Sequence, residues 1–126
     1  MKILSIVETA YRATLEEQDD TILWLNHNLK RSGADVTLLL RANAVNYAVR
    51  GQDARGLAFG EKKLAHPPEP DRDLEKLIES KVAVYIVEED LRERGVPQDR
   101  LIDGLEKISR SKLPALLEGF DHVWHW

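Results

Sequence analysis

Three glutamates of this sequence have the positions that acid–base chemistry needs. Glu8 and the pair Glu88 and Glu89 each follow directly on a short apolar run with the character of a buried strand. Parallel strands end at one edge of a sheet, so these carboxylates could form an acid–base pair or a hard-cation site there, joined by His66 from the long loop. Acids in the first turn of a helix are also favoured by the helix dipole, and we favour this second interpretation of Glu88 and Glu89.

The segment from residue 41 to residue 63 could instead bind an anion. It holds five basic residues against two acids, a local charge of +3. Helix starts at Asn43 and Glu88 would direct backbone amides to the same edge, and Tyr11 lies in a loop where a ligand could be met. A sulfur oxyanion or a phosphorylated metabolite suits such a place, although solvated side chains on a mobile loop explain the same composition more simply. The five basic residues are Arg41, Arg50, Arg55, Lys62 and Lys63.

Sequence spacing argues against a metal site. His122 and His125 lie on a predicted strand, where residues three apart point to opposite faces, so they cannot chelate one ion. The same alternation places Trp124 and Trp126 on the face of His122, and we expect them to pack against a helix or a neighbouring subunit. The sequence has no cysteine, which excludes disulfides, thiolate nucleophiles and cysteine-ligated zinc. We expect no metal and no cofactor.

Three apolar runs and the closing aromatic segment predict four of the strands that must position these groups. Leu105–Ser109 is ambiguous, and we favour a fourth short strand there. The third is an unbroken run of β-branched, aromatic and small apolar residues, which is typical of a strand buried on both faces, and we place it at the centre of the sheet. Helical segments separate the strands, which predicts a three-layer α/β/α sandwich, Rossmann-like, on a five-stranded parallel sheet. The simplest division is one domain over residues 1–126. The predicted strands are Ile3–Val7, Val36–Leu40, Val82–Val87, Leu105–Ser109 and Asp121–Trp126.

Capping residues and glycines predict the helices between those strands. A capping box at Thr14–Glu17 starts a helix that closes at Gly33. Its buried stripe is expected to be Ile22, Leu25 and Leu29. Asn43 is the expected cap of a short helix, and Ser111 that of the last one. The remaining predicted helices are Ala44–Arg50, 71–80, Glu89–Arg94, a turn over Asp99–Asp103 and one ending near Glu118. The intervening stretch from Gly51 to Pro70 is expected to be a long surface loop.

Composition and charge restrict the class of partner. The net charge of −4 argues against a nucleic-acid binder, which normally carries a basic stripe. No apolar run approaches the roughly 20 residues that span a bilayer, and the first residues lack the pattern of a signal peptide. We therefore expect a cytoplasmic protein that binds neither nucleic acid nor membranes.

With the strands placed, the sequence resembles the DsrE/DsrF-like family, small α/β proteins of sulfur relay. The matching pieces are the first strand, the helix closing on the run SGADV, the block VYIVEEDLRERGV, the LIDG turn and the closing FDHV segment. The resemblance implies oligomers or mixed complexes of related subunits. In active members it also implies a cysteine that carries sulfur as a persulfide at the end of the third strand. That position falls here on Val87 or Glu88, and neither can do this chemistry.

Two hypotheses follow for the function. The first is a cysteine-free DsrE/DsrF-like subunit, homo-oligomeric or mixed, that binds a small anionic ligand or supports assembly in sulfur metabolism without carrying persulfide. Its ligand edge would involve Glu8, Tyr11, Asn43, Glu88, Glu89 and His66. The second is an enzyme acting on a small metabolite, with Glu88 as the general acid or base. A strongly raised carboxylate pKa in a closed pocket would favour the second hypothesis.

Overall fold

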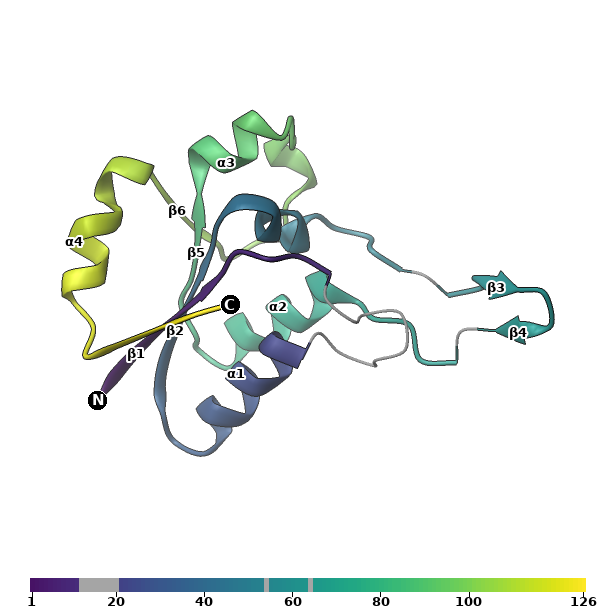
Figure 1. Ribbon diagram of the computed structural model, residues 1–126, viewed down its shortest axis with the longest axis horizontal. Helices are drawn as coiled ribbons and strands as arrows, with labels where there is room; N and C mark the ends of the chain where they lie inside the picture. Colours follow the sequence, from purple (N-terminus) through teal and green to yellow (C-terminus); the bar gives the residue numbers. More distant parts are fainter. Residues whose placement is uncertain (12–20, 54, 64) are drawn as a thin grey trace.

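A computed structural model describes residues 1–11, 21–53, 55–63 and 65–126 (Figure 1). The capping box predicted at Thr14–Glu17 lies outside the described residues. Within them the chain forms the predicted five-stranded parallel sheet, in the order β6-β5-β2-β1-β7. The strands are β1 (Lys2–Val7), β2 (Asp35–Leu40), β5 (Val84–Val87), β6 (Glu106–Ile108) and β7 (His122–His125). All five predicted strands are confirmed.

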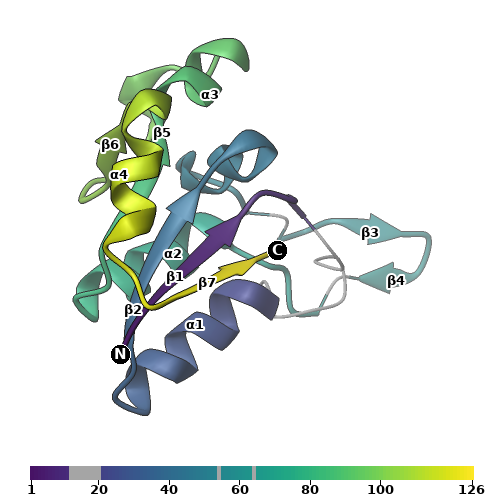
Figure 2. The ribbon, with the colours of Figure 1, turned by 60° about the vertical axis from the view of Figure 1, so that its left-hand side comes forward.

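Helices cover the sheet on both faces, as predicted for a three-layer sandwich (Figure 2). The first face packs against α1 (Thr21–Arg31), η1 (Ala42–Ala48) and α2 (Pro70–Glu79), and the second against α4 (Leu113–Glu118). Strand alternation decides which side chains enter each layer. Val7, Leu40 and Ile86 face the first layer, whereas Ile6 and Val87 face the second. The remaining helices are α3 (Glu88–Glu93), η2 (Gln98–Arg100) and η3 (Arg110–Lys112).

The third predicted strand is not the central one. β2 occupies the middle of the sheet, and β5 lies second from the edge, between β2 and β6. The prediction of burial on both faces is nevertheless confirmed, because Val84, Ile86 and Val87 are fully buried. A strand next to the edge can be covered this completely because α2 lies under one of its faces and α4 over the other.

Three details of the predicted helices are wrong. Asn43 does not cap η1, because the 3₁₀ helix starts at Ala42, two residues before the predicted start, and Arg41 takes the cap position. Ser111 lies within η3, and α4 follows with Lys112 at its cap and a proline in its first turn. On α1, Leu23 and Asn26 join Ile22 as the buried residues, while Leu25 and Leu29 are only partly buried. Burial shifts because α1 contacts α2 as well as the sheet.

The expected long loop carries a hairpin of two short antiparallel strands, β3 (Ala58–Phe59) and β4 (Lys62–Lys63). The hairpin projects away from the sheet and its helices in both views (Figures 1 and 2). No helix among the described residues is both long and apolar enough to cross a membrane.

Gly104 joins η2 to β6 in a backbone conformation that side chains rarely adopt, with φ of +87°. A Cβ at this position would lie 2.8 Å from Ile78 Cγ2 of α2. Gly33 has a similar φ of +92°, but a Cβ there would meet no atom within 4 Å. Substitutions at the two glycines can therefore distinguish the cost of backbone strain, which both share, from that of steric overlap, which only Gly104 has.

We expect Gly104→Ala to lower the free energy of unfolding by about 2–4 kcal/mol, because the strained backbone and the overlap with Ile78 add. Gly33→Ala is the matched control and should cost only the backbone term, about 1–2 kcal/mol. Urea denaturation of the two variants measures both values. Equal losses would show that the contact with Ile78 relaxes freely.

Candidate functional site

The carboxyl ends of β1, β2 and β5 lie side by side and define the candidate site. In the parallel register Val7 is level with Leu40, and Leu40 with Ile86. β2 therefore lies between β1 and β5, and its following residue, Arg41, comes between Glu8 and the start of α3. Two strand spacings, about 10 Å, separate the ends of β1 and β5. The sheet order thus keeps Glu8 apart from Glu88 and Glu89.

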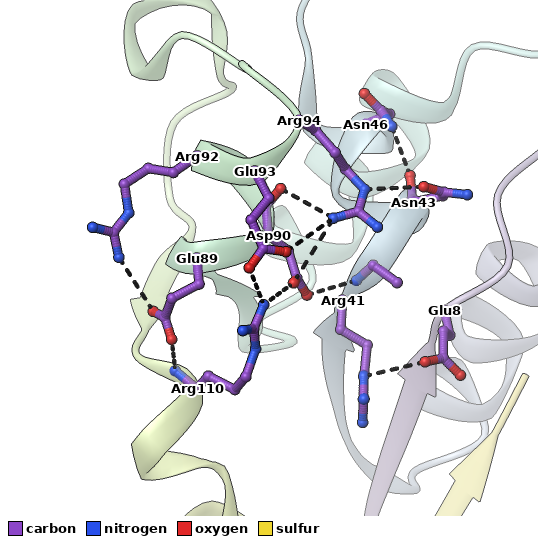
Figure 3. Close-up of polar contacts among 11 residues, drawn as sticks. Glu8, Arg41, Asn43, Asn46, Glu89, Asp90, Arg92, Glu93, Arg94 and Arg110 are labelled. Carbon is purple, nitrogen blue, oxygen red and sulfur yellow. Dashed lines mark hydrogen bonds and ion pairs between the residues drawn. The ribbon is translucent and has the colours of Figure 1, made fainter.

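Glu8 contacts two basic side chains at this edge. Its Oε1 lies 3.5 Å from Arg41 Nε (Figure 3), and its Oε2 lies 2.7 Å from His125 Nε2 of β7. All three side chains are between a third and just over a half exposed. The backbone holds Glu8 in place, because its N–H donates to the Trp126 carbonyl at 3.0 Å. Glu8 is therefore part of a charge-balanced pair on the surface and not of a carboxylate pair.

Asp90, the third residue of α3, is the most buried charged side chain at the edge, with 7% of its surface exposed. Its Oδ2 accepts from Ala42 N–H at 2.7 Å, and its Oδ1 accepts from Arg110 at 2.5 Å. Arg94 lies 3.8 Å from Oδ1 on the next turn of the helix (Figure 3). Ala42 has a φ of +50°, and the bond to Asp90 helps to hold that strained residue, which costs about 1–2 kcal/mol in isolation.

Two neighbouring glutamates complete this arrangement, which we call the Asp90 cluster: Glu89, Asp90, Glu93, Arg94 and Arg110. The backbone N–H of Arg110 donates to Glu89 at 2.5 Å, and the Arg110 guanidinium donates to Glu93 at 3.1 Å. Arg94 Nε donates to the side-chain oxygen of Asn43 at 2.9 Å. The Asp90 cluster therefore ties α3 both to η1, which follows β2, and to η3, which follows β6.

Opposing effects act on the Asp90 carboxyl. Burial raises its pKa, but the hydrogen bonds from Ala42 and Arg110 and the charges of Arg110 and Arg94 together bring the pKa below its ordinary value. The Arg110 guanidinium shows the reciprocal effect, since Asp90 and Glu93 raise its pKa. A general base that works near neutral pH needs a raised carboxylate pKa, so Asp90 is suited to holding charges together and not to proton transfer.

The other predicted site residues are distributed around this edge. Glu88 begins α3 with a partly buried side chain, and no hydrogen bond or ion pair joins that side chain to another described residue. Asn43 is exposed and holds Arg94. His66 is exposed beyond the β3–β4 hairpin, and the described residues contain no group of three acids or histidines that could hold a metal ion.

Tyr11 lies on the η1 side of β1. Its N–H donates to the Tyr47 hydroxyl at 2.7 Å, and its own hydroxyl donates to Gln52 Oε1 at 2.5 Å. Partial burial raises the pKa of the Tyr11 phenol, and the nearby Asp71 carboxylate raises it further. Tyr11 therefore belongs to the packing between β1, η1 and the root of the hairpin.

His122 and His125 lie on opposite faces of β7, as predicted. His122 Nε2 is 3.0 Å from Met1 Sδ, whereas His125 contacts Glu8. Trp124 and Trp126 share one face and meet edge to face, with their ring centroids 6.5 Å apart. Trp126 packs partly against the core and donates from Nε1 to the Ser5 hydroxyl at 3.0 Å.

Asp90 and Arg110 are the residues of this site that sequence reasoning did not single out. Asp90 is the last of three acids in the first turn of α3, and Arg110 follows it by twenty residues with no local pattern that links them. The local sequence holds no signal for the burial of Asp90, because consecutive residues of a helix do not share a face and the adjacent Leu91 therefore does not mark it.

The fold is that of a class of small α/β proteins with a DsrE/DsrF-like fold. Over its full length and all of the other chain, this protein is similar to the YchN protein from E. coli, with 25% sequence identity and a TM-score of 0.74. It is also similar in fold to MTH1491 from Methanobacterium thermoautotrophicum, a protein of unknown function, with 14% identity and a TM-score of 0.65. That similarity covers 98% of this chain and 97% of MTH1491. The sequence matches no family model and no curated protein.

We expect Asp90→Asn to lower the free energy of unfolding by about 2 kcal/mol, because two charge-assisted hydrogen bonds to a buried group are weakened. Glu93→Gln is the matched control. It also contacts Arg110 but is more than half exposed, so its cost should be below about 0.5 kcal/mol.

The same variant predicts a change in pH dependence. A lowered folded-state pKa means that Asp90 stabilises the fold above the ordinary aspartate pKa of about 3.9 and loses this contribution as the pH falls through the folded value. Urea denaturation should therefore be measured at neutral pH and at pH values below the ordinary aspartate pKa. On acidification, Asp90→Asn should lose less free energy of unfolding than the wild type. Identical slopes would exclude Asp90 as a source of the acid sensitivity.

Proposed function

We propose that this chain is a cysteine-free member of the DsrE/DsrF-like family that acts as an assembly or non-covalent binding subunit in intracellular sulfur metabolism. The observation that carries the proposal is the end of β5. The position that the family resemblance assigns to the sulfur carrier is occupied by Val87, which is fully buried, and by Glu88. A persulfide requires a sulfur nucleophile, and this chain has no cysteine.

The charge arrangement supports assembly more strongly than the capture of a free anion. In and beside the Asp90 cluster, three acids (Glu89, Asp90 and Glu93) are matched by three arginines (Arg92, Arg94 and Arg110). Arg41, the arginine at the end of β2, is matched by Glu8. An anion entering this edge would have to displace a carboxylate from each arginine that it contacts. A binding role is left to Glu88, whose side chain is available to a hydrogen-bond donor.

Native mass spectrometry of protein purified gently from its own cells tests the proposal. We expect an oligomer of this chain, or a mixed complex in which a related subunit supplies the cysteine. A mixed complex would gain sulfur from a persulfide donor on that subunit only. A bare monomer with no bound molecule would contradict the proposal.

Installing a thiol tests whether the end of β5 is the position for sulfur carriage. In Glu88→Cys the thiolate should attack the outer sulfur of a small donor persulfide, so that the protein gains one sulfur atom and the donor leaves as a thiol. Val87→Cys is the matched control, and its buried thiol should react at least about tenfold more slowly. Intact-mass spectrometry measures both rates. Equal rates would contradict the assigned geometry.

The alternative proposal is a small-metabolite enzyme that uses Glu88 as the general acid or base. The observation in its favour is the unpaired, partly buried Glu88 side chain described above. Glu88→Gln keeps the shape of the side chain and removes its proton transfer. If turnover of any metabolite is found, this variant should reduce kcat by about 10²–10⁴-fold. Unchanged turnover would remove Glu88 from the mechanism.

A further inference from the structure

The hairpin is an arm without a partner in the described chain. It comprises residues 55–63, and β3 and β4 make their main contacts with each other. A two-stranded hairpin of this length is at most marginally stable in water on its own. Phe59 at its tip is 68% exposed and Leu57 is 38% exposed, so the arm presents apolar surface that its own fold does not cover.

One face of the arm is both apolar and basic. Phe59 is paired with Lys62 across the hairpin, which puts both side chains on the same face. Leu57 falls on that face as well, because residues two apart in an extended chain point the same way. Over residues 55–63 there are three basic side chains and one acid, so the arm has a net charge of +2. A partner for it should therefore be acidic and long enough to cover an extended segment.

An acidic groove follows the outer side of α2. Two adjoining cavities of about 620 Å³ and 450 Å³ share Arg50, Glu75 and Glu79 in their lining. Together they are lined by five carboxylates against three basic side chains, a net charge of −2. The carboxylates are Asp53, Asp71, Glu75, Glu79 and Asp103.

The basic side chains of this groove are already matched. Arg50 pairs with Asp103 at 2.9 Å, and Arg72 and Lys76 each pair with an acid on their own helix or beside it. Glu75 and Glu79, one helical turn apart, have no ion-pair partner among the described residues. They are therefore the carboxylates available to lysines from outside.

Length and position make a second copy of this chain the fitting partner. The segment from residue 53 to residue 59 spans up to about 20 Å when extended. α2 rises only about 12 Å between residues 71 and 79, so the arm can cover the groove. Gly51, Gln52 and Asp53 form the root of the arm and also line the groove. Two copies with their grooves facing each other can thus exchange arms reciprocally. The result is a dimer with two-fold symmetry, in which both arms and both grooves are occupied.

We propose that the arm of one copy docks in the acidic groove of a second copy, with Phe59 and Leu57 covered against α2 and Lys62, on the same face, directed at Glu75 and Glu79. Lys63 lies on the opposite face of the hairpin and adds positive charge beside the groove. The inference rests on the assembly role proposed above and names its partner and its surface.

Sedimentation analysis of the full chain tests the exchange. Phe59→Ala should raise the dissociation constant of the pair about tenfold or more, because a large apolar side chain loses its burial. The double variant Lys62→Glu and Lys63→Glu should weaken the pair similarly. Adding Glu75→Lys and Glu79→Lys to the same chain should restore affinity to within about threefold of the wild type, because the charges match again.

Trp24→Ala is the control, because Trp24 is an exposed aromatic of α1 outside both cavities of the groove, and it should leave association unchanged. Circular dichroism checks that every variant is folded. If the wild type associates but Phe59→Ala and the lysine reversals keep its affinity, or if the reversed groove gives no rescue, the arm exchange is wrong while the assembly role stands. A wild-type monomer throughout the micromolar range would overturn the arm exchange, whereas the mixed complex of the proposed function is tested separately by native mass spectrometry.

Discussion

The carboxylate of Asp90 is the interaction on which the geometry of the strand ends depends. It is buried, and both of its oxygens are used, one by the N–H of Ala42 and the other by Arg110. Its partners follow two different strands, so a single side chain on α3 joins the ends of β2, β5 and β6. A buried carboxylate without such partners would be strongly destabilising. Asp90 can therefore be buried only if η1 and η3 are placed so that Ala42 and Arg110 donate to its carboxylate.

Sheet order then decides which charges meet. Glu8 and Glu88 both follow strands that were predicted correctly, yet they do not form a pair, because β2 lies between their strands and brings Arg41. The edge is consequently a series of matched charges in which Glu88 alone, among the described acids of that edge, keeps an unpaired side chain. Because its arginines are already paired with acids, this edge is better suited to contact another protein than to capture a small anion.

Local patterns in the sequence were sufficient for the strands but not for their order. The runs at Val36–Leu40 and Val82–Val87 are apolar enough to identify buried strands, whereas the choice of β2 as the central strand depends on crossover connections that no local residue encodes. The fourth strand was ambiguous in the sequence, because only Leu105 and Ile108 of its five predicted residues are apolar. The caps predicted at Asn43 and Ser111 are wrong because 3₁₀ helices shift both helix starts. Asp90 and Arg110 were missed because their pairing is long-range and both belong to residue types that are usually exposed.

The Gln52 side chain gives the root of the arm a fixed base. Its amide nitrogen donates to the carbonyls of Asn46, Tyr47 and Val49, while its oxygen accepts from Tyr11. One glutamine thus ends η1 and joins it to the loop after β1. The anchoring of the hairpin base consequently depends on this one side chain, and its removal would leave the Tyr11 hydroxyl without its acceptor and three backbone carbonyls in and after η1 without this donor.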